Sequence, residues 1–254
     1  MPNMYSLKNT KNIKNKHSNI LIMGGSGVIG RAIAMEFGRQ GWSVGVHYHH
    51  NRASAEKTAA TIQETDGNAR LYQTDVNDPS QVRNIFQSFL QDHKSLTLLV
   101  WAVGIAPATL LAKTTSDAWG QTIQTNLTGA FHVLKEAAPI FERQRDGGVV
   151  LIGSLSGEYG MAGQAAYSAS KAGLVGLMRA TAREWGSWNV RVNAIFPGWH
   201  SSPLSTTGID SALASQTHLL NRTPSLQHVA TSIHHLASTQ DISGQIWNLD
   251  SRIW

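Results

Sequence analysis

Tyr167 and Lys171 stand four residues apart, a spacing that places them on one face of a helix with their Cβ atoms about 6 Å apart. A free tyrosine has a pKa of about 10 and gives up its proton poorly at neutral pH. A nearby ammonium lowers that pKa, whereas burial raises it. If the ammonium prevails, the phenol can act as a general acid and base. The spacing is common by chance, so this interpretation needs support from other residues.

Ser154 supplies part of that support. It lies 13 residues before Tyr167 and directly follows a short apolar run, residues 148–152, that predicts a strand. Ligands of open α/β sheets bind at the carboxyl ends of the strands, so a hydroxyl at this point faces the expected site. We expect Ser154 to hold the same carbonyl oxygen that Tyr167 protonates.

A glycine-rich turn joins the first predicted strand, residues 19–23, to a helix. Its spacing fits Gly25-x-Gly27-x-x-Gly30 and also Gly24-x-x-Gly27-x-x-Gly30. Glycines let a backbone approach a pyrophosphate closely, and the helix N-terminus offers unpaired N–H groups. A tight turn without a ligand is the alternative. The predicted cofactor contacts in this turn are Gly24, Ser26, Gly27, Val28 and Ile29.

The end of the second predicted strand, residues 43–48, bears on the choice of cofactor. A carboxylate there would bind the ribose 2′-hydroxyl of NAD, and a cation would accept the 2′-phosphate of NADP. The sequence runs His47-Tyr48-His49-His50-Asn51-Arg52, without an acid. We therefore predict NADP(H), with Arg52 and His49 as contacts. Three close histidines also suggest a metal, but no carboxylate accompanies them, so we predict no metal site.

The chain as a whole predicts how these residues are positioned. Apolar runs alternate with helical patterns, which is typical of βαβ units and of a parallel sheet covered on both faces. The predicted strands are residues 19–23, 43–48, 69–73, 96–103, 148–152, 190–195 and 244–249. The predicted helices are residues 29–39, 53–64, 116–143 and 164–185, with another opening at 78–80. We expect a single α/β domain with seven parallel strands in three layers.

Composition excludes several classes of protein. The chain has 254 residues, of which 41% are hydrophobic, and it has no cysteine, so disulfides and thiolate metal sites are excluded. No apolar run reaches the roughly 20 residues that span a bilayer, and no secretory signal is evident. We expect a cytoplasmic protein without a membrane partner.

The net charge of +5 does not indicate a nucleic-acid partner. Four lysines, Lys8, Lys11, Lys14 and Lys16, lie in the first 18 residues and account for four of those charges. The remainder lacks the basic stripe that phosphate backbones require. We predict a flexible basic extension over residues 1–18 and a folded domain over residues 19–254.

In order and spacing, these motifs resemble those of the short-chain dehydrogenase/reductase family from about residue 19 to residue 250. The resemblance implies a Rossmann-type, doubly wound fold. It assigns catalysis to Ser154, Tyr167 and Lys171, and to Asn126 as the residue that holds a water of a proton relay. Further implied cofactor contacts are Asp75 and Val76 near the adenine, Ala102 and Gly104 after the fourth strand, Pro197 and Gly198 beside the nicotinamide, and Tyr167 and Lys171 themselves.

The chain also departs from the family pattern. Met23 and Val28 replace a usual threonine and glycine, and Trp101-Ala102-Val103-Gly104 replaces Asn-Asn-Ala-Gly. The sequence ends Asp250-Ser251-Arg252-Ile253-Trp254, where family members often have Asp-Gly-Gly. These changes leave the proton-transfer residues intact and bear on cofactor affinity.

The resemblance implies an NADP(H)-dependent enzyme that reduces a carbonyl to a secondary alcohol, or the reverse. Gln164-Ala165-Ala166-Tyr167 and Phe196-Pro197-Gly198 resemble 3-oxoacyl-(acyl carrier protein) reductases of fatty acid biosynthesis. Pteridine reductases and sugar or alcohol dehydrogenases are alternatives. A nucleotide-sensing protein without turnover is an alternative of another class.

Substrate and subunit contacts are expected as follows. A Ser- and Thr-rich segment, about residues 199–222, predicts a substrate loop, and the expected substrate contacts are Ser154, Gly160, Tyr167 and Trp199. The family implies a homodimer or homotetramer built on the helices of Asn126 and Tyr167. Three tryptophans are equally suited to an interface or to the core: Trp185, Trp188 and Trp254.

Overall fold

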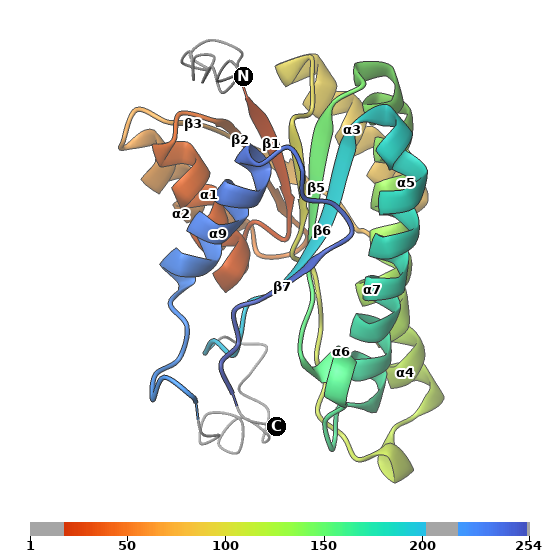
Figure 1. Ribbon diagram of the computed structural model, residues 1–254. Coiled ribbons are helices and arrows are strands. Elements are labelled where there is room, and N and C mark those ends of the chain that lie inside the picture. Colours follow the sequence, from red (N-terminus) through yellow and green to blue (C-terminus); the bar gives the residue numbers. More distant parts are fainter. Residues whose placement is uncertain (1–17, 202–217, 253–254) are drawn as a thin grey trace, which may run out of the picture.

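A seven-stranded parallel sheet forms the centre of the molecule (Figure 1). The computed structural model describes residues 18–201 and 218–252. The strands are β1 Asn19–Met23, β2 Ser43–Tyr48, β3 Asn68–Gln73, β4 Leu98–Trp101, β5 Gly147–Ile152, β6 Val190–Phe196 and β7 Ile246–Asn248. Their order is β3-β2-β1-β4-β5-β6-β7, which confirms the predicted doubly wound, Rossmann-type sheet.

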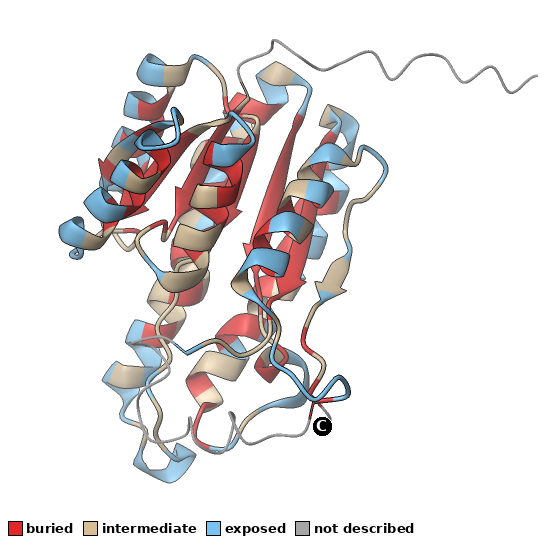
Figure 2. Ribbon diagram, turned by 90° about the vertical axis from the view of Figure 1, so that its left-hand side faces the viewer, coloured by how far each residue is buried: buried red, intermediate tan, exposed pale blue. Residues whose placement is uncertain are grey.

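Helices cover both faces of the sheet and bury its central strands, as Figure 2 shows. One core lies between the sheet and helices α1 Val28–Arg39, α2 Arg52–Gln63 and α9 Leu226–Ser238. The other lies beneath α3 Pro79–His93, α5 Gly129–Gln144 and α7 Ala165–Trp185. The central strands β1, β4, β5 and β6 are buried along their whole length because both of their faces are covered.

Strand register brings the segments that follow the strands to one edge of the sheet. Met23 pairs with Trp101, and Trp101 with Leu151. Ile152 pairs with Ile195, one residue before the end of β6. The glycine turn, the segment after Trp101, the segment of Ser154 and the Pro197 turn therefore start side by side.

The long helix predicted over residues 116–143 is divided. It consists of α4 Ser116–Ile123, a π-helical turn η2 Gln124–Thr128, and α5. A π turn inserts one residue into the helical repeat, and such turns are frequent at functional sites. The apolar periodicity on either side resembles that of one helix, so the interruption is not visible in the pattern.

Helix α9 was not predicted from the sequence. Ser225 caps it by accepting a hydrogen bond from the His228 N–H at 3.1 Å. Its apolar residues Val229, Ile233 and Leu236 are buried against the sheet. The serine before a repeat of four and then three residues is the signal that would have found this helix.

Some predictions fall on residues that the structure does not describe. Residues 1–17 of the predicted extension and residues 202–217 of the predicted substrate loop lie outside the described part. Trp254 lies outside it as well. No helix in the described ranges is long and apolar enough to cross a membrane.

Candidate active site

Tyr167 and Lys171 lie in the first turns of α7, as their spacing predicts. The Lys171 side chain is buried, and its Nζ donates a hydrogen bond to the Ile152 carbonyl oxygen at 2.8 Å. The same Nζ lies 5.6 Å from the centre of the Tyr167 ring. Burial lowers the pKa of Lys171 to about 8. The end of β5 thus anchors the lysine beside the phenol.

Burial dominates the electrostatics of Tyr167. It raises the pKa of the phenol, while a hydrogen bond with Ser154 and the charge of Arg252 lower that pKa to a smaller extent. Lys171 is not among the groups that lower the pKa of Tyr167. Its ammonium donates a hydrogen bond to the Ile152 carbonyl. Tyr167 is therefore protonated at neutral pH, which is the state required of a proton donor.

Ser154 is brought to Tyr167, as predicted. It follows β5, where the Gly153 N–H donates to the Ile195 carbonyl at 2.8 Å and holds the strand end in the sheet. The Ser154 Oγ accepts a hydrogen bond from the Ser156 N–H at 3.1 Å, at the start of the short helix α6 Ser156–Tyr159. A hydrogen bond also joins Ser154 to the Tyr167 side chain. Two hydroxyls therefore converge at this edge.

Asn126 connects the segment after β4 to α7. This fully buried residue lies in the η2 turn, and its Oδ1 accepts from the Ile105 N–H at 2.8 Å. Its Nδ2 donates to the Ile105 carbonyl at 2.9 Å and to the Ser170 Oγ at 3.0 Å. These bonds occupy the side chain, so its expected role toward a relay water stays a prediction.

Gly104 completes this cluster. A Cβ built on it would lie 3.5 Å from the Asn126 Oδ1 and 3.7 Å from the Lys171 Nζ. The segment after β4 therefore passes close to both side chains. Of the altered Trp101-Ala102-Val103-Gly104 stretch, Trp101 is a core residue with 1% exposure, so its role is packing.

The glycine turn has the shape of a phosphate cradle. Gly24 has a φ of +87°, and a Cβ there would come within 2.8 Å of the Ala102 backbone, so glycine is required. The amides are already in use: the Gly24 N–H donates to the His47 Nδ1 at 2.9 Å, and the Gly27 N–H to the Gly24 carbonyl at 3.0 Å. The amides of Val28 and Ile29 open α1, where helix N–H groups have no intrahelical acceptor. They suit the pyrophosphate, and the contribution of Gly24 is steric.

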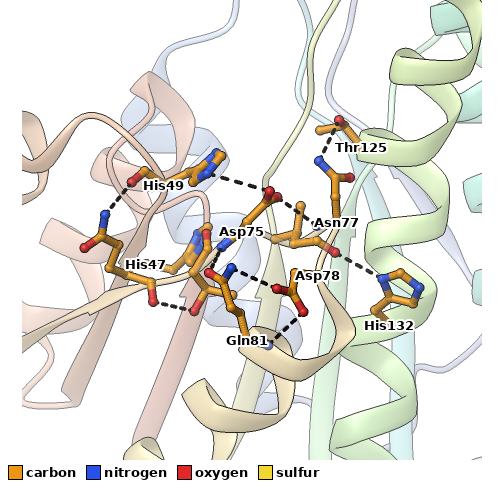
Figure 3. A network of polar contacts seen from close by, with 11 residues as sticks. His47, His49, Asp75, Asn77, Asp78, Gln81, Thr125 and His132 are labelled. Carbon is orange, nitrogen blue, oxygen red and sulfur yellow. Dashed lines mark hydrogen bonds and ion pairs between the residues drawn. The ribbon is translucent and has the colours of Figure 1, made fainter. Parts of the chain in front are cut away.

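The residues that we expect to choose the cofactor follow β2 and β3 (Figure 3). The His49 Nε2 lies 3.8 Å from the Asp75 Oδ2, and the Asp75 Oδ1 accepts from the Asn77 N–H at 2.9 Å. Arg52 is exposed, and its Nε donates to the Glu56 Oε1 at 2.8 Å on the same helix. A 2′-phosphate would have to displace this carboxylate.

Val76 is a further expected cofactor contact at this end of the sheet. Val76 is buried, and its carbonyl oxygen lies 3.1 Å from the His132 Nδ1, on α5. The described residues contain no group of three or more histidine, aspartate or glutamate side chains that could hold a metal ion.

The turn after β6 carries the remaining expected contacts. Gly198 has a φ of +82°, and a Cβ on it would touch Pro224 and approach the Asp250 Cα to 3.6 Å. The Pro197 carbonyl lies 3.0 Å from the His200 Nε2. Trp199 is half-buried, and its Nε1 has no hydrogen-bond partner among the described residues. Gly160 is exposed and lies at the end of α6, away from packed neighbours.

Sequence reasoning noted the unusual chain end but did not place it. Asp250 and Arg252 form a buried ion pair in which the guanidinium Nε lies 2.9 Å from both carboxylate oxygens. This pair packs beside the Gly198 turn, and its cation acts on Tyr167. The two charges two residues apart were the available signal, but their burial depends on the tertiary fold.

The sequence matches a family model described as short chain dehydrogenase over residues 18–211. It is 34% identical to the 3-oxoacyl-(acyl-carrier-protein) reductase FabG of Staphylococcus aureus, over 73% of this chain and 75% of that protein. A 3-oxoacyl-(acyl-carrier-protein) reductase of Synechocystis is 32% identical, over 91% of this chain and 94% of that protein.

Solved structures support the fold independently. Levodione reductase has a TM-score of 0.87 at 24% identity and covers 94% of this chain and 98% of its own. A dehydrogenase/reductase from Sinorhizobium meliloti has a TM-score of 0.86 at 23% identity, with 94% of this chain and 96% of its own covered. At these identities the likeness concerns the fold alone.

Proposed function

Because this chain belongs to the short-chain dehydrogenase family and is an NAD(P)-dependent oxidoreductase acting on CH–OH groups, we propose that it reduces the ketone of a 3-oxoacyl thioester with NADPH. The juxtaposition of Tyr167, Ser154 and Lys171 carries this proposal. The thioester is proposed from the 3-oxoacyl-(acyl-carrier-protein) reductases that the sequence resembles.

The side chains of this protein supply the proton of the reaction and replace it afterwards. When bound, the nicotinamide supplies a hydride to the carbonyl carbon. Ser154 donates a hydrogen bond to the carbonyl oxygen, and Tyr167 gives that oxygen its phenolic proton, so that a hydroxyl forms and a phenolate remains. The Lys171 ammonium stabilises this phenolate and binds the nicotinamide ribose, and Asn126 holds the water through which the proton is replaced.

Tyr167 takes part in reduction as the phenol, which is the form that burial stabilises, and in oxidation of an alcohol as the phenolate. The proposed substrate contacts are Ser154, Tyr167, Gly160 and Trp199.

NADP(H) is proposed over NAD(H) from the end of β2. The cation Arg52 and the neighbouring His49 stand where a carboxylate would select NAD. The remaining proposed cofactor contacts are Ser26, Gly27, Val28, Ile29, Asp75, Val76, Ala102, Gly104, Pro197 and Gly198, with Gly24 in its steric role. We place the enzyme in the cytoplasm, a reducing compartment with which a cysteine-free chain is compatible.

We further propose a homodimer or homotetramer. Trp119 on α4 is 40% exposed and Phe131 on α5 is 47% exposed. Large aromatic side chains of this kind are enriched at subunit interfaces. Trp185 is core, because it is 4% exposed and packs against Trp188 and Phe141.

The direct test is NADPH oxidation with an acetoacetyl thioester. Tyr167→Phe removes the proton donor, so we expect turnover to fall by at least about 100-fold while NADPH binding is retained. Tyr159→Phe is the matched control, because this exposed tyrosine lies at the same edge of the sheet, and it is expected to keep wild-type turnover.

Equal rates for wild type and Tyr167→Phe would refute the role of the phenol. Turnover of a dihydropteridine, a sugar or a simple alcohol in place of the thioester would reassign the substrate. Binding of NADPH without turnover over a broad carbonyl panel would favour the nucleotide-sensing alternative.

A further inference from the structure

His47 is a polar residue inside an otherwise apolar strand. It lies in β2 with 3% exposure, and both ring nitrogens have a partner. Its Nδ1 accepts from the Gly24 N–H at 2.9 Å, and its Nε2 lies 2.9 Å from the Thr74 carbonyl oxygen. Because an N–H can only donate and a carbonyl can only accept, one neutral tautomer satisfies both contacts: a lone pair on Nδ1 and a proton on Nε2.

The two partners of His47 lie on the turns on either side of β2. Gly24 opens the glycine turn after β1, and Thr74 directly precedes Asp75 after β3. The imidazole therefore spans β2 and ties together the two segments that the cofactor would contact at its pyrophosphate and its adenine. Figure 3 shows the ring close to His49 and Asp75.

The surrounding backbone leaves the glycine turn little freedom to compensate. The Ser26 N–H donates to the carbonyl oxygen of His47 itself at 3.3 Å. A Cβ on Gly25 would come within 2.9 Å of a Val46 methyl group. Met23 and Ala102, which flank Gly24 in space, have no side-chain acceptor for its N–H. Without the imidazole, this N–H would lack the acceptor that it has here.

We infer that His47 is a positioning residue for the cofactor, which holds the glycine turn in the shape that presents the Val28 and Ile29 amides to the pyrophosphate. This role rests on the proposed nicotinamide-dependent function. We expect a substitution of His47 to change the affinity for the cofactor and to leave the proton-transfer step unchanged, because the imidazole contacts the glycine turn and lies away from Tyr167.

Two substitutions separate the two bonds of the ring. In His47→Asn, the side-chain oxygen lies near the position of Nδ1, so an acceptor for the Gly24 N–H is retained while Thr74 is out of reach. In His47→Gln, the side-chain nitrogen lies near the position of Nε2, so the donor to Thr74 is retained and the acceptor for Gly24 is lost. We expect His47→Gln to raise the Kd for NADPH about tenfold and His47→Asn less than about threefold.

The experiment measures the Kd of the full chain for NADPH by titration of cofactor fluorescence, with kcat at saturating NADPH and Tm recorded alongside. His93→Gln serves as control, since this partly buried histidine lies at the far end of α3 and is expected to leave the Kd unchanged. The inference predicts a change in Kd and in the KM for NADPH, with kcat nearly constant.

Three outcomes contradict the inference. Equal Kd values for wild type and both variants, with only Tm lowered, would make His47 a purely structural residue and leave the proposed function standing. An equal loss of NADPH affinity in both variants would show that the hydrogen bond from Gly24 matters no more to cofactor binding than the hydrogen bond to Thr74. Wild-type protein that binds no nicotinamide cofactor would overturn the proposed function and this inference together.

A second measurement needs no variant and keeps the inference testable if His47→Gln does not fold. The ¹⁵N spectrum of the histidine side chains in wild-type protein should show His47 with a proton on Nε2 alone. Addition of NADPH should shift its Nδ1 resonance, because that atom accepts from the turn that binds the phosphates. A protonated Nδ1, or an Nδ1 resonance that does not respond to NADPH, would overturn the inference.

Discussion

At the scale of single residues, the candidate site holds a charged side chain, Lys171, and a protonated acid, Tyr167, in one buried region. Lys171 keeps its charge near neutral pH with the Ile152 carbonyl as its hydrogen-bond acceptor, and Tyr167 keeps its proton because its surroundings disfavour the phenolate. We expect Tyr167 to give up its proton only when a substrate carbonyl oxygen develops negative charge beside the phenol. The cost of the buried charge should be measurable.

We expect stability to rise with pH because of Lys171. In the folded chain its pKa is about 8, whereas its ordinary value is 10.5. Between these two pH values the unfolded chain binds more protons, so the free energy of unfolding increases with pH; below about pH 8 the cost of the buried charge is fully present. The shift corresponds to about 3 kcal/mol.

Urea unfolding at about pH 7.5 and about pH 10 measures this contribution. Lys171→Met should lack the rise, and the exposed-site control Lys57→Met should retain it. A rise in Lys171→Met equal to that of wild type would assign the pH dependence to other groups.

At the scale of elements, the start of α2 bears on the cofactor. Asn51 caps the helix by accepting from the Ser54 N–H at 3.0 Å, and the Ser54 Oγ donates to the Ser26 carbonyl at 2.7 Å. The helix that carries Arg52 is therefore tied to the glycine turn. The Arg52–Glu56 pair on this helix is easily opened, because both side chains are exposed and solvent screens their attraction.

We predict that Arg52→Ala raises the KM for NADPH about tenfold and changes the KM for NADH less than about twofold, because the cation meets only the 2′-phosphate. Glu56→Gln should act in the opposite direction and lower the KM for NADPH, since it removes a competing carboxylate. Steady-state kinetics with both cofactors measures this. Equal changes for NADPH and NADH in Arg52→Ala would rule out the phosphate contact.

At the scale of the whole molecule, a few large apolar side chains are exposed on the surface of the described residues. Most large apolar residues lie in the two cores on either side of the sheet, whereas the aromatic residues Trp119 on α4 and Phe131 on α5 are exposed. A second copy of the chain would cover these aromatic rings.

Light scattering should give wild-type protein a mass of two or four times the 27.6 kDa of one chain. Phe131→Glu places a charge in the proposed interface and should shift the mass toward the monomer, while Lys57→Glu on α2, on the other face, should not. A monomeric wild-type protein at micromolar concentration would refute the proposed oligomer.

Local pattern was enough to predict most of the framework. Strands β1 and β5 are short apolar runs and α1 has apolar residues at helical spacing, and the pairing of Tyr167 with Lys171 follows from helical geometry alone. The π turn at Asn126 escaped prediction because its signal is a shift of one residue within a continuous helical pattern. Helix α9 escaped it because the preceding segment reads as irregular.

The sequence by itself determined the family, the parallel sheet and the residues that meet at its edge, since motif spacing and apolar period are local properties. Tertiary structure alone decided how the charges act. It aims the Lys171 ammonium at Ile152, buries Tyr167 so that its pKa rises, places Arg252 near the phenol, and turns His47 between Gly24 and Thr74. Burial and hydrogen-bond direction depend on neighbours distant in sequence, and so the tyrosine and lysine that spacing alone pairs acquire their protonation states only in the fold.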